Sequence, residues 1–155
     1  MAIEELKKFI GKTDAPYLLD VEKGAIKRYA EAVGDLNPLY HDEEYARASK
    51  HGAIICPPGF FGWAVKSRPY LSETRQEVLE NLAKAGYKHF LDGGTDFEFV
   101  LPVRAGDKLV ASGRIADIYE RDGKKGNLVF AVTEITYINQ NGDQVATVRW
   151  TLVCS

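Results

Sequence analysis

The sequence predicts an α+β fold, in which a helix-rich first half is followed by a meander of antiparallel strands. Apolar residues recur at helical spacing up to about residue 86, and beyond it they alternate with polar residues as in β-strands. Asp122-Gly123 and Asn141-Gly142 are dipeptides typical of two-residue hairpin turns. We therefore expect a long antiparallel sheet with one face that needs an apolar cover.

Each expected helix has a recognisable start or end. Gly34 suits the position just after a helix that begins near Lys23, and Asp42 can cap the helix that follows it. Pro57-Pro58 opens a segment that is apolar nearly all round, so this core helix should be buried and should cover the sheet. The expected elements are helices over residues 2–9, 23–33, 43–48, 58–65 and 72 or 74 to 86, and strands over residues 17–21, 96–101, 109–119, 127–138 and 145–154.

Composition indicates a single domain over residues 1–155, since 45% of the residues are hydrophobic and 27% are charged. The net charge of −2, with scattered Lys and Arg, gives no basic footprint for nucleic acid. No apolar run approaches the roughly 20 residues of a membrane span, so we expect a cytoplasmic protein without a membrane partner. Cys56 and Cys154 are far apart and are expected to be reduced thiols.

The stretch from Gly34 to Asp42 gathers a carboxylate, an amide, a phenol and an imidazole between two expected helices. Asn37-Pro38 should stop any helix, because proline lacks an N–H and disfavours helical geometry in the preceding residue. The resulting kink would allow Asp35 and His41 to converge. A carboxylate and an imidazole around one water can move protons near neutral pH, so we expect any chemistry here.

Simpler interpretations of the same residues remain open. Asp35 can be a helix-end carboxylate that bonds local N–H groups, His41 an exposed loop histidine, and Asn37 a turn former. The acidic and imidazole residues from Asp35 to Glu43 match no known metal-ligand spacing, so we expect no metal, and nothing in the sequence indicates a cofactor.

Four segments, residues 24–26, 29–42, 54–58 and 102–107, closely resemble the MaoC-like dehydratases in content and order. The resemblance covers nearly the whole chain. It is strongest to the branch called FAS1-like dehydratase, or MaoC dehydratase N-terminal domain, which is related to the (R)-specific enoyl-CoA hydratases. It implies a hot-dog fold, in which an antiparallel sheet wraps a central helix and two units pair into a dimer.

The resemblance also implies a reaction of fatty acid metabolism, the hydration of 2-enoyl thioesters or the dehydration of (R)-3-hydroxyacyl thioesters on coenzyme A or acyl carrier protein. Asp35, with His41 or Tyr40, would take and deliver the protons. The enolate oxygen would be stabilised by N–H donors at the start of the core helix. The residues expected to contact the substrate are Asn37, Gly59, Phe60 and Trp63.

Two departures from the family pattern keep other functions open. The (R)-specific hydratases read Asp-x-Asn-Pro-x-His, which places Tyr40 at the histidine position, and tyrosine is a poor base at neutral pH. They also carry His-Gly where this chain has Cys56-Pro57. An alternative is therefore a non-catalytic acyl-binding subunit, paired with a second MaoC-like chain in a heterodimer rather than a homodimer. A hot-dog thioesterase ranks last, because residues 58–65 contain no carboxylate to activate water.

Overall fold

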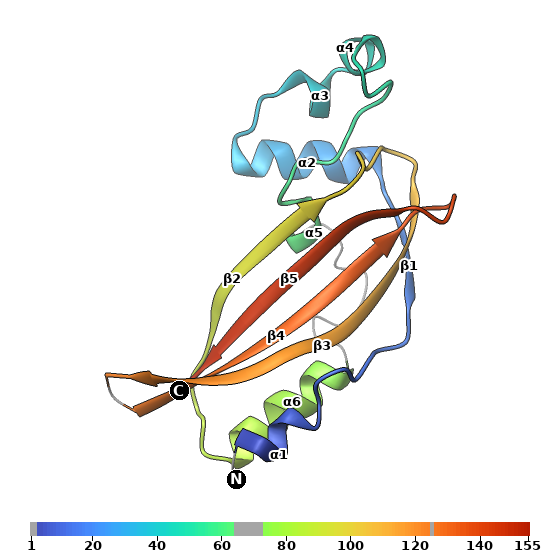
Figure 1. Cartoon of the computed structure of the whole chain (residues 1–155). Coiled ribbons are helices and arrows are strands. Elements are labelled where there is room, and N and C mark those ends of the chain that lie inside the picture. The colour runs from blue at the N-terminus through green and yellow to red at the C-terminus, as the bar shows by residue number, and fades with distance from the viewer. Residues whose placement is uncertain (1–2, 64–72, 125) are drawn as a thin grey trace.

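The chain forms an antiparallel sheet that packs against a set of short helices (Figure 1). The computed structural model describes residues 3–63, 73–124 and 126–155. No helix in these ranges is both long and apolar enough to cross a membrane. In chain order the elements are α1 (Ile3–Lys7), β1 (Tyr17–Asp20), α2 (Lys23–Val33), α3 (Pro38–His41), α4 (Glu43–Ala48), α5 (Phe60–Trp63), α6 (Glu73–Lys84), β2 (Phe90–Phe99), β3 (Lys108–Gly123), β4 (Gly126–Ile138) and β5 (Gln144–Cys154).

The strand order is β1-β3-β4-β5-β2 and every neighbouring pair is antiparallel, which confirms the predicted α+β class. The β3–β4 and β4–β5 hairpins turn close to the two predicted dipeptides. β2 differs from the prediction, because it begins at Phe90 and ends at Phe99. Its first half passes through Asp92-Gly93-Gly94 with a bulge in the pairing to β5 rather than a turn.

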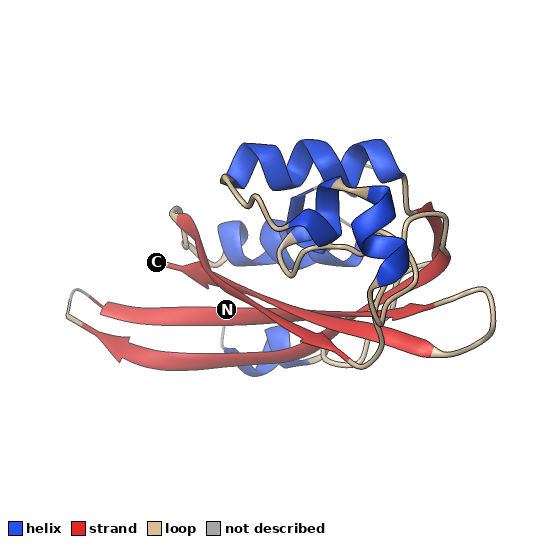
Figure 2. Ribbon diagram, turned by 90° about the horizontal axis from the view of Figure 1, so that it is seen from above, coloured by secondary structure: helices blue, strands red, loops and turns tan. Residues whose placement is uncertain are grey.

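One face of the sheet, the inner face, packs against the helices in two core clusters. The first joins α2, α3, α4 and α5 to inner-face side chains that include Leu109 and Tyr137. The second joins α1 and α6 to Ile115 and Val129, further along the same two strands. The two helical groups lie at opposite ends of the strands in Figure 1, and most of the helical ribbon lies on one side of the sheet in Figure 2.

The segment after α2 is more helical than predicted. Gly34 ends α2 with a φ of 72°, as expected of a residue just past a helix. Pro38 does not stop helical structure; it occupies the first turn of α3, where its missing N–H is not needed. Residues 38–41 therefore form a helical turn, in which neighbouring side chains diverge by about 100° rather than about 180°.

The predicted core helix is described over Phe60–Trp63 as α5, while residues 64 and 65 lie outside the described ranges. The Phe61 ring packs against Tyr137 of β4, with centroids 4.4 Å apart. The Phe60 ring meets Tyr29 of α2 edge-on, at 6.1 Å and 83°. α5 therefore lies between α2 and the inner face, as the expected cover of the sheet requires.

Gly59 leaves no room for a side chain, since a Cβ there would lie 2.0 Å from the Tyr29 hydroxyl oxygen. We expect Gly59→Ala to lower the free energy of unfolding by about 1–3 kcal/mol, because the packing of α2 on α5 must shift. Adding Tyr29→Phe should recover part of this loss by removing the closest atom. Urea denaturation measures both, and an Ala variant as stable as the wild type would contradict the contact.

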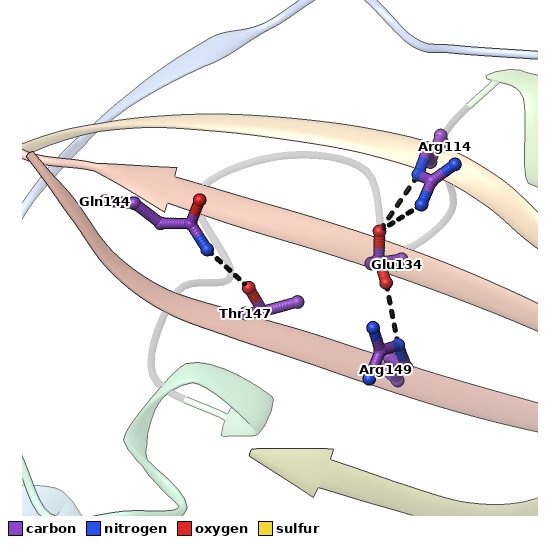
Figure 3. Close-up of polar contacts among 5 residues, drawn as sticks. All are labelled: Arg114, Glu134, Gln144, Thr147 and Arg149. Atoms are coloured by element: carbon purple, nitrogen blue, oxygen red, sulfur yellow. Dashed lines mark hydrogen bonds and ion pairs between the residues drawn. The ribbon is translucent and has the colours of Figure 1, made fainter. Parts of the chain in front are cut away.

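Glu134 of β4 is a buried charge on the opposite, outer face of the sheet, with 7% of the residue exposed. Arg114 donates to Oε1 through Nε and Nη2 at 2.9 and 2.7 Å, and Arg149 donates to Oε2 through Nε at 2.7 Å (Figure 3). Burial alone would raise the pKa of Glu134. The hydrogen bonds and charges of the two arginines outweigh it and hold the pKa below its usual value.

A folded-state pKa below the unfolded value of about 4.3 means that ionised Glu134 stabilises the fold above that pH. This contribution is lost as the pH falls through the folded-state pKa. We therefore expect Glu134→Gln to lower the free energy of unfolding at neutral pH by about 1–3 kcal/mol. The difference from the wild type should shrink in acid, which urea melts over a pH series would measure; a constant difference would refute the assignment.

Candidate functional site

The loop between α2 and α4 is held by hydrogen bonds from its own polar side chains. The Asp35 Oδ1 atom accepts from the Asn37 N–H at 3.1 Å, and Asn37 Oδ1 accepts from the Leu39 N–H at 3.1 Å to cap α3. Asp42 Oδ1 accepts from two N–H groups at the start of α4, at 2.9 and 3.0 Å, which confirms the predicted cap. The side chains of Asp35 and Asn37 thus act as local turn formers.

The His41 ring lies against the main chain of Asp35 and not against its carboxylate. The imidazole Nε2 lies 2.8 Å from the Asp35 carbonyl oxygen. A carbonyl only accepts, so Nε2 carries the hydrogen and, in the neutral ring, Nδ1 is left as the acceptor. The ring is half-buried and its orientation is therefore fixed by the loop backbone rather than by the Asp35 carboxylate.

Tyr40 lies in the first core cluster with 7% of the residue exposed. Burial, followed by the negative charge of Asp35, raises its pKa above the ordinary tyrosine value. The phenol therefore stays protonated near neutral pH and can donate a hydrogen bond but cannot serve as a base. Tyr40 stands at the histidine position of the hydratase motif, and in the helical turn of α3 it points into the core. The next residue, His41, points back to the loop instead.

Gly59 carries a backbone donor at the start of α5. Pro57 and Pro58 have no N–H, and the Phe60 N–H donates to the Pro57 carbonyl at 3.1 Å. The Gly59 N–H makes no hydrogen bond with any described residue. Phe60 itself is 2% exposed and packs as core, and the Trp63 side chain lies outside the described part.

Cys56 precedes this turn, and its N–H donates to the Val103 carbonyl at 2.8 Å. Burial, and then the charge of Asp107, raises the pKa of its thiol far above the ordinary value, which keeps the thiol protonated near neutral pH. A shallow surface groove runs between the start of α2 and residues 105–107, and none of the predicted site residues lines it. Across residues 3–63, 73–124 and 126–155, no three metal-ligating side chains come together.

Tyr29 is the site residue that sequence reasoning passed over, because its helical spacing with Ile26 and Ala30 indicated only an apolar face. Its hydroxyl lies against Gly59, so it limits the space at the start of α5. Two features of the sequence could have indicated the role of Tyr29. Its hydroxyl interrupts an otherwise apolar helical stripe, and a glycine stands between Pro58 and Phe60.

Comparison of the sequence with known families gives a match over most of the chain. The profile described as FAS1-like, dehydratase domain region, matches residues 8–148. A UPF0336 protein of Streptomyces coelicolor is 38% identical over 110 residues, covering 70% of this chain and 68% of that protein. A probable enoyl-CoA hydratase alpha subunit of Thermomonospora curvata is 32% identical over 136 residues, covering 83% of this chain but 43% of that longer protein.

Solved structures share the fold. The ChsH1-ChsH2 complex from Mycobacterium tuberculosis aligns with a TM-score of 0.81 at 21% identity, over 97% of this chain and 87% of the matched chain. The HadBC (3R)-hydroxyacyl-ACP dehydratase complex from the same organism gives 0.70 at 24%, over 94% and 96%. The R-hydratase PhaJ1 from Pseudomonas aeruginosa gives 0.60 at 19%, over 94% and 81%. The chain therefore belongs to the FAS1-like dehydratase family and has the hot-dog fold of the MaoC-like dehydratases.

Proposed function

We propose that this chain is the thioester-binding subunit of a heteromeric MaoC-like dehydratase. The assembly would interconvert 2-enoyl and (R)-3-hydroxyacyl thioesters on coenzyme A or acyl carrier protein. The observation that carries the proposal is the internal bonding of the loop after α2. Tyr40 is buried in the core, His41 Nε2 is bound to the Asp35 carbonyl, and Asp35 Oδ1 accepts the Asn37 N–H.

Addition of water to an enoyl thioester needs a base for the attacking water and an acid at the neighbouring carbon. Both groups must keep a lone pair or a proton available to water and substrate. In this chain, Asp35 and His41 spend much of their hydrogen-bonding capacity on the backbone of their own loop. The complete Asp and His pair is therefore assigned to a second MaoC-like subunit, while this chain contributes the backbone around Gly59, at the start of α5, to the acyl site.

The names of similar proteins support an assembly of unlike subunits. Two of the matched structures are complexes described by two component names, ChsH1-ChsH2 and HadBC. One relative is named as an alpha subunit. The Gly59 N–H supports a role in binding, because it can donate to a thioester oxygen at the start of α5.

A second candidate is a self-sufficient hydratase that uses Asp35 and His41. It is favoured by the Nδ1 atom of His41, which is left as an acceptor when Nε2 donates to the loop carbonyl. Asp35 Oδ2 also makes no hydrogen bond within the described residues. The two candidates differ in whether the isolated chain turns over substrate.

We expect the purified chain alone to cause no loss of enoyl absorbance with enoyl-CoA substrates of any chain length. Co-expression with a MaoC-like subunit that carries an intact Asp-x-Asn-Pro-x-His motif should give a stable complex with hydratase activity. Enoyl absorbance and co-purification on a tag carried by one chain measure the two results. Turnover by the isolated chain would favour the second candidate instead.

Asp35→Asn and His41→Ala in this chain should change kcat of the complex by less than about threefold, because the proton transfers lie elsewhere. If Asp35 and His41 are the acid and base, the same variants should lower kcat by about 100-fold or more. Replacement of the Asp or His of the second subunit's motif is the matched positive control. Thermal melts of each variant separate lost activity from lost folding.

A further inference from the structure

A row of alternating charge crosses the outer face of the sheet on four neighbouring strands. The strand register places Asp96 of β2 beside Arg149 of β5, Arg149 beside Glu134 of β4, and Glu134 beside Arg114 of β3. The signs along the row are therefore negative, positive, negative and positive. Figure 3 shows the last three joined across their strands.

Ion pairs within the chain hold some of the charges in this row in place and leave others without a partner among the described residues. Glu134 fixes both arginines, whose side chains remain 52% exposed. Within the described residues Arg149 is engaged through Nε alone, so its terminal N–H groups are available to another molecule. Asp96 is exposed and makes no hydrogen bond or ion pair with any described residue.

A second row on the same face is apolar. It runs from Leu91 of β2 through Val153 and Phe130 to Tyr119 of β3. The Phe130 and Tyr119 rings stack, with centroids 4.9 Å apart and planes 2° from parallel. Leu91 is 64% exposed, so this end of the row leaves apolar surface in water when the chain is alone. At the other end the Arg121 guanidinium lies over the Tyr119 and Phe130 rings, 5.3 and 5.7 Å from their centroids.

We propose that the outer face binds the outer face of a second copy of this chain, with the two-fold axis parallel to the strands. When this axis runs between β4 and β5, it places β2 against β3 and β5 against β4 of the second copy, so each charge in the row meets its opposite. Asp96 faces Arg114 of the second copy, and Arg149 faces Glu134 of the second copy.

The same axis places apolar residues against apolar residues. Leu91 faces Tyr119 of the second copy, and Val153 faces Phe130 of the second copy. Sheets packed face to face lie about 10 Å apart, a gap that arginine and aromatic side chains can fill. Charge and apolar surface are thus complementary in one arrangement.

This contact is distinct from pairing along the open edge of β2, and it goes beyond the proposed function. Within one chain Asp96 and Arg114 lie three strand spacings apart, about 14 Å. Pairing of β2 with β2 of another copy keeps Asp96 at least that far from Arg114 of that copy, whereas stacking of the two outer faces brings them together. A second copy on the outer face leaves the inner face and its acyl site untouched.

Sedimentation equilibrium of the full chain tests the proposal. Asp96→Lys and Arg114→Glu should each weaken self-association by about tenfold or more, because like charges then face each other. An equimolar mixture of the two variants should restore association, since each new charge meets its opposite in the mixed pair. Glu5→Lys on exposed α1 makes the same charge change as Asp96→Lys, is the matched control for that variant, and should have no effect.

Three results would overturn the proposal. The first is a wild-type chain that stays monomeric at every concentration, or that associates only with a second MaoC-like subunit and not with itself. The second is association that Asp96→Lys does not weaken. The third is a mixture that fails to restore association although circular dichroism shows both variants folded, since this would indicate contact through the β2 edge.

Discussion

The packing of α5 between α2 and the sheet is the contact on which the rest of the structure depends. Phe61 lies against Tyr137 on one side, and Phe60 lies against Tyr29 on the other. Each such side chain stabilises the fold by about 1.5–3 kcal/mol when fully buried. One short helix thereby attaches α2 to the inner face, and the loop that follows α2 takes its position from this attachment.

That loop illustrates a conflict between stability and proton transfer. A turn is rigid when its polar groups are hydrogen-bonded, but an acid or base must keep its capacity for water and substrate. The loop between α2 and α4 favours rigidity over free acid or base groups, since Asp35, Asn37 and Asp42 all bond loop or helix N–H groups. This is the physical reason for assigning the proton transfers to a partner and the binding surface to this chain.

Local signals in the sequence predicted most elements, because caps and turns act over a few residues. The helix from Lys23 to Val33 with Gly34 after it, the Asp42 cap and both hairpins were predicted in this way. The first half of β2 was missed because Asp92-Gly93-Gly94 is typical of a turn, whereas pairing with β5 accommodates it as a bulge. Tyr40 and His41 could not be oriented, since the sequence indicated a kink and the structure has a helical turn.

The Glu134 cluster could not have been predicted at all, because only the register of three strands brings Arg114, Glu134 and Arg149 together. Its presence is also not explained by folding, since a buried ion cluster costs much of its Coulombic gain in desolvation, and apolar residues often replace it without loss. The cluster does hold two arginine side chains in fixed positions, although arginine side chains on a surface are usually mobile. Fixed cations lose little entropy on contact, which is an advantage for recognising another surface rather than for closing a core.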